Sequence, residues 1–306
     1  MLSFLRRGKS NNNRAGLYLT RDGVAAVRLV REGESVFRLA ECVYHPLAEN
    51  TEPNVQLGKL PLTRASVFSV LEPASYQLLL VEAPDVPEEE LRAAVRWRIK
   101  DLIDFHLDDA VIDVFEMPAH SRGGQAKMMY TVAARADSVR KQVDLIGDAG
   151  LSLETIDIPE LCLRNVADRF EEDGRGVALL YLADEQGFLI VVRQGVMYLT
   201  RRIETGVNTL ASADGLRADL VAGLALEIRR SLDYFESHYD QKPVFTLYSA
   251  GLEAADRNDL AVDLSVTVED VDLAQVLGLD CEVDDELRRR CLPAIGAALR
   301  QEAVAL

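Results

Sequence analysis

The chain has 306 residues, which is long enough for two lobes with a sizeable core, and its shares of hydrophobic (48%) and charged (27%) residues are those of an ordinary soluble protein. A formal net charge of −16 argues against nucleic acid as a partner, because phosphate binding requires clustered lysine and arginine. No apolar run approaches the roughly 18 residues that cross a bilayer, so we expect a cytoplasmic protein.

Residues 1–14 form a short basic leader, MLSFLRRGKSNNNR. The leader lacks the apolar core of roughly 7–15 residues that marks a signal peptide. Its apolar and basic side chains leave two interpretations open, a solvated terminus and a weak contact with an anionic membrane surface.

The cysteines and histidines do not form a recognisable site. The cysteines lack CxxC or metal-ligand spacing, which indicates free buried thiols in a reducing compartment. They are Cys42, Cys162, Cys281 and Cys291. The histidines are scattered singly, without the partners that acid–base or metal chemistry requires, so we expect neither a metal site nor a catalytic histidine. They are His45, His106, His120 and His238.

A strand–turn–strand–turn–strand pattern opens the chain and recurs later. Residues 15–41 contain the turn signals Asp22-Gly23 and Glu32-Gly33 between alternating apolar stretches, which predicts three antiparallel strands. Residues 176–203 repeat this architecture. A chain that begins the same unit twice predicts two related lobes; a chance likeness of two hairpins is the alternative.

The segments between and after these units predict alternating helices and strands. The expected strands are 75–84, 110–118, 127–136, 151–159 and 244–251, and the expected helices follow residue 85 and span 137–149, 159–170, 214–238 and 284–303. We therefore expect a leader at 1–14, a first lobe at 15–158 with an inserted subdomain at about 85–135, a second lobe at 159–283, and a C-terminal helix at 284–306.

The two repeated units, with a later strand that ends in small residues at Gly251, resemble the actin-like (ribonuclease H-like) nucleotide-binding fold. Four segments also resemble, in order and spacing, the type IV pilus assembly protein family PilM, and most closely its MshI counterparts from MSHA pilus biogenesis. They are residues 1–10, 75–114, 132–166 and 227–237. The resemblance implies an α/β fold with two lobes, mixed sheets and a small inserted subdomain.

Phosphate binding in the actin-like fold needs an aspartate at the end of the first strand and a glycine in the following turn, in both lobes. The aligned positions here are Tyr18 and Thr20 in the first lobe and Tyr181 and Ala183 in the second. A neutral tyrosine holds no cation, and the Thr20 and Ala183 side chains stand where phosphates would approach. We therefore expect no catalytic residue, no ATP hydrolysis and no cofactor, with ATP binding disfavoured.

A few other residues bear on a nucleotide site. Asp22 and Asp184 lie close enough to replace the missing carboxylates, although turn statistics favour ordinary turn residues. Only Gly251 remains of the glycine pair on the adenosine side. Glu227 and Arg230 lie on the helix that faces the adenosine in this fold, or else form a solvated pair at helical spacing.

The resemblance implies a non-catalytic cytoplasmic adaptor at the inner face of the inner membrane, within an MSHA-type pilus assembly platform. In the PilM family a groove near the inserted subdomain takes the cytoplasmic N-terminal peptide of the bitopic membrane protein PilN. We expect this groove among residues 85–135, with Leu91, Val95, Trp97 and Ile103 as candidate lining residues. A place in the core is the alternative for all four, and we favour it for Leu91 and Val95. A homo-oligomer is compatible with the sequence.

Two other functions stay open at this point. One is an actin-like ATP-binding protein or ATPase with a divergent phosphate site. The other is the cytoplasmic domain of a type II secretion protein of the GspL kind, which shares the fold.

Overall fold

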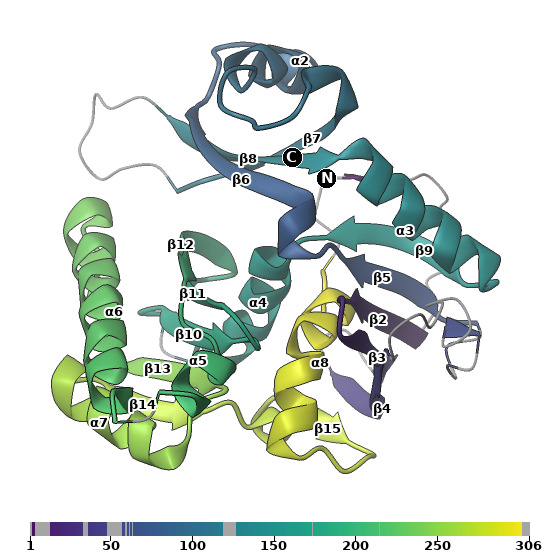
Figure 1. Cartoon of the computed structure of the whole chain (residues 1–306). Coiled ribbons are helices and arrows are strands. Elements are labelled where there is room, and N and C mark those ends of the chain that lie inside the picture. The colour runs from purple at the N-terminus through teal and green to yellow at the C-terminus, as the bar shows by residue number, and fades with distance from the viewer. Residues whose placement is uncertain are drawn as a thin grey trace.

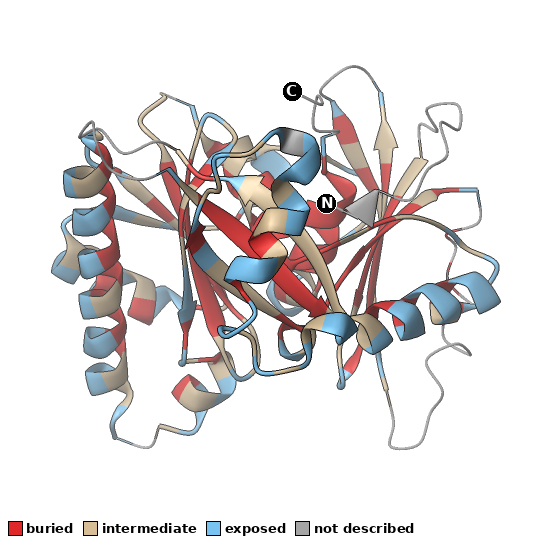
Figure 2. Cartoon of the chain, turned by 90° about the horizontal axis from the view of Figure 1, so that it is seen from above, coloured by how far each residue is buried: buried red, intermediate tan, exposed pale blue. Residues whose placement is uncertain are grey.

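The computed structural model shows two large β-sheets side by side, with helices between and around them and a small third sheet at the top of Figure 1. It describes residues 2–3, 13–32, 36–47, 57–58, 60, 62, 64–118, 127–172, 174–213 and 215–301. Buried residues follow the sheets and the inner sides of the helices, and exposed residues lie on the outer sides (Figure 2). Burial thus follows the layers of the fold.

The first sheet has seven strands in the order β1-β9-β5-β2-β3-β4-β15. They are β1 (Leu2–Ser3), β2 (Asn13–Leu19), β3 (Gly23–Arg31), β4 (Phe37–Pro46), β5 (Ser66–Val70), β9 (Ser152–Asp157) and β15 (Gly278–Leu279). β2 and β3 form the hairpin predicted from Asp22-Gly23, in which the Thr20 N–H donates to the Gly23 carbonyl at 2.9 Å. The other predicted turn, Glu32-Gly33, lies partly outside the described residues.

The second sheet confirms the predicted repeat, because its order β12-β11-β10-β13-β14 matches β4-β3-β2-β5-β9 of the first. Its strands are β10 (Val177–Leu182), β11 (Gly187–Arg193), β12 (Val196–Ile203), β13 (Thr246–Ala250) and β14 (Thr267–Asp270). In each sheet an antiparallel meander is followed by parallel pairing with the next strand. The turn at Gln194 and Gly195 has φ values of 51° and 72°, the left-handed pair that a two-residue hairpin requires.

Two helices separate the sheets, α4 (Pro159–Ala167) and α8 (Asp285–Ala298). They pack against each other, with α4 also on β11 and α8 also on β2 and β3. Glycine allows this close packing: a Cβ at Gly296 would overlap the Cys162 carbonyl, and one at Gly16 would overlap the Ala294 carbonyl.

The remaining elements cover the outer faces. The helices α5 (Val207–Ala211), α6 (Arg217–Tyr239) and α7 (Ala254–Leu264) belong to the second lobe, and α3 (Ala136–Asp148) packs against β9. Short 3₁₀ helices lie at Pro73–Ser75, Leu107–Asp109, Asp168–Phe170 and Leu273–Gln275. Along α6 the buried and exposed residues fall on opposite sides, which explains the helical spacing of its apolar residues.

The small sheet starts earlier than the inserted subdomain predicted at about 85–135. It has the order β6-β8-β7, with strands β6 (Tyr76–Glu82), β7 (Ala110–Glu116) and β8 (Met128–Arg135). β6 pairs with β8 along its whole length, so residues 76–82 belong to this sheet. Helix α2 (Glu88–Arg98) covers one face and buries Val95 and Ile99 against Val81.

The predicted boundary between a second lobe at 159–283 and a separate C-terminal helix is also displaced. β15 pairs with β4 through Gly278 and Arg38, so the chain has returned to the first sheet before residue 283. Helix α8 ends at Ala298 rather than near residue 303, and residues 302–306 lie outside the described part. The boundary differs from the prediction for a tertiary reason: α8 buries its apolar face against the first sheet.

All four cysteines are free thiols, as predicted; Cys42, Cys162 and Cys291 are buried and Cys281 is half-buried. Among the helices of the described residues, none is both long and apolar enough to cross a bilayer. The described part of the chain contains no group of three or more His, Cys, Asp or Glu side chains arranged to hold a metal ion.

Substituting Gly296→Ala should destabilise the chain by about 3 kcal/mol, measured by urea unfolding, because the new methyl group meets the Cys162 backbone rather than a flexible side chain. The matched control is Gly223→Ala in α6, where a Cβ meets nothing within 4 Å. That substitution should stabilise the chain by about 0.5–1 kcal/mol through helix propensity. Equal effects of the two substitutions would contradict the packing described for α4 and α8.

Candidate functional site

The strand ends predicted to have lost their acidic residues carry two buried phenols. Tyr18 lies near the first turn and Tyr181 lies near the second. Their exposed fractions are 7% and 2%, respectively. Burial raises the pKa of both phenols, that of Tyr18 well above its usual value. Both side chains are therefore neutral, and neither offers a charge to a metal ion.

The first turn is closed by its own atoms and by a neighbouring ring. The Thr20 hydroxyl donates to the Gly23 carbonyl and accepts the Gly23 N–H, both at 3.2 Å. The Tyr44 ring packs against this turn, because a Cβ at Gly23 would overlap it. Asp22 is exposed, as an ordinary turn residue would be.

The second turn is tied to helix α8 by charge. Asp184 Oδ1 lies 2.7 Å from Arg289 and its Oδ2 lies 3.1 Å from Arg290. The Arg290 guanidinium also lies over the Tyr44 ring, 4.5 Å from its centroid. A chain of contacts thus runs from Gly23 in the first turn through Tyr44 and Arg290 to Asp184 in the second turn. Asp184 is bonded to two arginines, which is neither of the two roles considered from the sequence.

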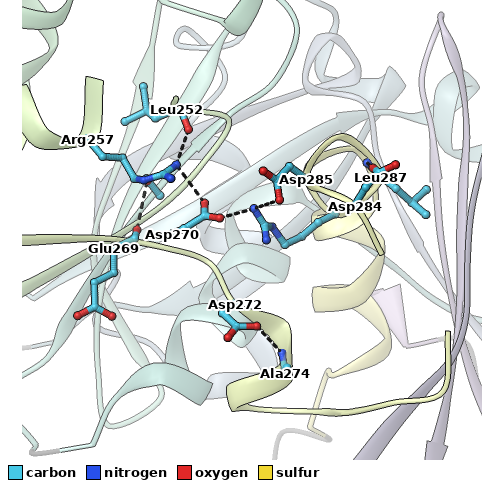
Figure 3. A network of polar contacts seen from close by, with 11 residues as sticks. Leu252, Arg257, Glu269, Asp270, Asp272, Ala274, Asp284, Asp285 and Leu287 are labelled. Carbon is cyan, nitrogen blue, oxygen red and sulfur yellow. Dashed lines mark hydrogen bonds and ion pairs between the residues drawn. The ribbon is translucent and has the colours of Figure 1, made fainter. Parts of the chain in front are cut away.

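A second group of ion pairs lies where the adenosine side was predicted (Figure 3). Asp270 lies 3.4 Å from Arg257 and 2.5 Å from Arg288, which also pairs with Asp285 at 3.1 Å. Arg257 donates to the Leu252 carbonyl as well. These contacts lie beside Gly251, where a side chain is excluded by a φ of 102° and because an added Cβ would lie 2.8 Å from the Leu182 carbonyl oxygen.

Three consecutive arginines of α8, Arg288 to Arg290, therefore join the two lobes through Asp270 and Asp184. We call them the arginine latch. The sequence prediction did not include them. The available signal was LRRRC at residues 287–291, three adjacent cations in a chain of net charge −16.

Glu227 and Arg230 do not join this group of contacts. Glu227 is half-buried and Arg230 is exposed on α6, which packs on β11, β12 and α7. Their helix lies on the outer side of the second sheet, away from α8 (Figure 1). Their predicted place beside an adenosine stays a prediction.

A buried carboxyl group lies at the start of α4. Glu160 is 4% exposed and accepts a hydrogen bond from the Tyr76 phenol. Burial raises the pKa of Glu160 above its usual range, and the hydrogen bond from Tyr76 offsets part of that rise. The carboxyl links the first residue of the small sheet to the helix between the lobes.

An apolar groove lies between the small sheet and the first large sheet. Its walls come from β7 and β8 on one side and from the ends of β5 and β9 and the start of α4 on the other. The lining residues are Leu71, Val111, Asp113, Val114, Phe115, Val132, Ala134, Ile156, Asp157, Ile158, Leu161 and Arg300. Asp157 and Arg300 form a buried ion pair on the second of these walls.

Trp97 and Ile103, which were predicted to line a partner groove, are not among these lining residues. Ile103 packs against the buried core between α2 and the small sheet, and Trp97 is 72% exposed on α2. The reason is that α2 covers the opposite face of the small sheet. Their role in partner binding stays a prediction, and neither residue belongs to this groove.

Comparisons with known proteins agree with this architecture. The family model described as "Type IV pilus assembly protein PilM" matches residues 77–213. No curated protein matches the chain. A solved PilM-PilN type IV pilus biogenesis complex has a chain that is 21% identical with a TM-score of 0.73, covering 94% of this chain and 97% of that one.

Two further structures share the fold at lower similarity. The cytoplasmic domain of EpsL, an inner-membrane component of the Vibrio cholerae type II secretion system, is 11% identical with a TM-score of 0.52, over 94% of this chain and 96% of that one. A Bacteroides thetaiotaomicron protein with an actin-like ATPase fold and unknown function is 8% identical with a TM-score of 0.50, over 94% and 99%. The predicted actin-like, two-lobed α/β fold is thus confirmed, and residues 77–213 are similar to the PilM family model.

Asp184→Asn should destabilise the chain by about 2 kcal/mol in urea unfolding, because it keeps the turn but removes the carboxylate from Arg289 and leaves Arg290 with Glu286 alone. The control is Arg21→Ala, which removes a 3.8 Å pair with Glu72 whose arginine is 81% exposed, and should change stability by less than about 0.5 kcal/mol. A loss for Asp184→Asn no larger than the control's would show that the latch does not hold the lobes.

Glu160→Gln should stabilise the chain relative to the wild type increasingly as the pH rises from about 5 to 8. A carboxyl whose folded pKa is raised contributes stability below its unfolded pKa and loses it as the pH rises through the folded pKa. Glutamine does not ionise and can still accept the Tyr76 hydrogen bond. Urea unfolding at several pH values measures the difference; exposed Glu89→Gln is the control and should give a flat difference.

Proposed function

We propose that this chain is a non-catalytic cytoplasmic adaptor of type IV pilus assembly, of the MshI kind in an MSHA-type pilus. It binds the cytoplasmic N-terminal segment of a PilN-like membrane protein and is held through that partner at the inner face of the inner membrane. The observation that carries the proposal is the apolar groove beside the small sheet, in a chain whose fold matches a PilM-PilN complex.

The groove has the features that an extended peptide requires. Val111, Phe115 and Ile156 supply apolar surface, and Asp113 supplies a polar anchor. The family match includes both strands of the small sheet that face it, β7 and β8. Apart from Asp113, the charged lining residues are Asp157 and Arg300, which pair with each other. Such a groove favours a short segment with apolar residues over a small polar ligand.

The chemistry at the two turns supports a non-catalytic role. Tyr18 and Tyr181 are buried and neutral, and the carboxylate nearest the second turn, Asp184, is bonded to Arg289 and Arg290. Phosphoryl transfer needs a metal-holding carboxylate and backbone that can approach the phosphates. The latch supplies a protein-made contact between the lobes where a nucleotide would supply one in an ATPase.

The peptide-binding proposal is tested by calorimetry with a synthetic peptide of the cytoplasmic N-terminal segment of the PilN-like protein encoded by the same organism. Val111→Glu should weaken binding at least tenfold, because it places a charge on the apolar wall of the groove. Trp97→Ala is the control and should leave affinity unchanged, since Trp97 lies outside the groove. If Trp97→Ala weakened binding and Val111→Glu did not, the peptide site would lie on α2 instead.

The non-catalytic proposal is tested by thermal unfolding with 1 mM Mg-ATP. A site with a dissociation constant of about 10 μM would stabilise the chain by about 2.7 kcal/mol at that concentration, and we expect no such shift. Stabilisation by Mg-ATP but not by Mg-AMP would show that phosphates still bind.

A further inference from the structure

One strand of the groove, β7, has an open side. The small sheet has the order β6-β8-β7, so within the described residues β7 is hydrogen-bonded to a strand on one side only. Its side chains alternate between two faces. Ile112 and Val114 pack toward α2, and Val111, Asp113 and Phe115 lie along the groove, which Val114 also helps to line.

The open side of β7 carries a charged residue between two apolar ones. Asp113 Oδ1 accepts the Val114 N–H at 3.0 Å and lies 3.2 Å from Arg92 of α2. The Asp113 side chain is 13% exposed, whereas that of Arg92 is 61% exposed. An inward-pointing charge on an edge strand is a device that keeps an unwanted strand from pairing with it. Here the Asp113 carboxylate accepts the Val114 N–H, a main-chain group that would donate to a carbonyl of an added strand.

On the opposite wall of the groove, the charged side chains already pair with each other. Asp157 is paired with Arg300 and also accepts the Ile158 N–H at 3.0 Å. Leu71, Ile156 and Leu161 complete that wall with apolar surface. The charge on the groove that a ligand can use is therefore Asp113, which it can share with or take from the exposed Arg92.

We propose that the partner segment binds as an added β-strand along β7, with a lysine or arginine facing Asp113. This inference rests on the proposed function and names the binding mode and the chemistry of the segment. Since Val111, Asp113 and Phe115 alternate, the segment has apolar, basic and apolar side chains at positions i, i+2 and i+4. The basic residue of the segment pairs with Asp113 in place of Arg92. A backbone carbonyl of the segment accepts the Val114 N–H in place of the Asp113 carboxylate.

The experiment uses the full chain and the synthetic PilN-like peptide, with its residues N-methylated one at a time. An added strand bonds through every second residue, so methylation of one set of alternate residues should weaken binding at least tenfold and methylation of the other set less than threefold. A uniform response along a peptide that binds would overturn strand addition and leave the proposed adaptor function intact. Absence of binding by the unmodified peptide would overturn both.

Charge is tested separately with Asp113→Asn, which keeps an acceptor for the Val114 N–H but removes the carboxylate. It should weaken the basic peptide about tenfold and reduce the salt dependence of binding. Asp108→Asn is the matched control, because Asp108 also pairs with an arginine of α2, Arg96 at 3.2 Å, but lies outside the groove. Equal binding by wild type and Asp113→Asn would overturn the assignment of the basic residue.

A second copy of this chain is the competing occupant of the β7 edge. Sedimentation equilibrium without peptide should show a monomer, and addition of peptide should leave one chain in each complex. A dimer that the peptide dissociates, and that Asp113→Asn strengthens, would assign the edge to self-association and overturn the proposal.

Discussion

The position of α8 between the two sheets is the constraint on which the rest of the structure depends. Its last two turns are completely buried, and Gly296 lies against the Cys162 backbone of α4. The Asn165 side chain donates to the Gly296 carbonyl at 2.9 Å, which fixes the two helices in register. Since α4 packs on the second sheet and α8 on the first, this single helix pair sets how the lobes face each other.

The N-terminal half of α8 places three cations where cations are disfavoured by the helix dipole. Acidic residues offset this arrangement. Asp284 accepts the Leu287 N–H at 2.8 Å, and Glu286 lies 3.0 Å from Arg290. The arginines are thereby free to point outward to Asp184 and Asp270, which belong to the second lobe. The charges that join the lobes here therefore belong to the protein itself.

The groove follows from the same arrangement of elements. The small sheet leaves the first lobe at Tyr76 and returns at Arg135, so one of its faces is turned back toward the ends of β5 and β9. Tyr76 is bonded to Glu160 at the start of α4, which anchors the small sheet close to the interlobe helices. α2 covers the other face of the small sheet. The apolar side chains that α2 does not cover line the groove.

Local sequence patterns determined the elements and their repetition. Asp22-Gly23 and Gln194-Gly195 favour tight hairpins in any context, and the alternation around them identifies strands, so the repeated meander was predictable. Packing partners decided the rest. Whether Trp97 or Val111 faces a groove depends on which face of the small sheet α2 covers, and spacing along the chain does not contain that information. Likewise, Arg288 to Arg290 and Asp184 are separated by about a hundred residues in sequence. Only the tertiary structure brings them within ion-pair distance, because α8 returns to the first sheet while its charged end remains beside the second.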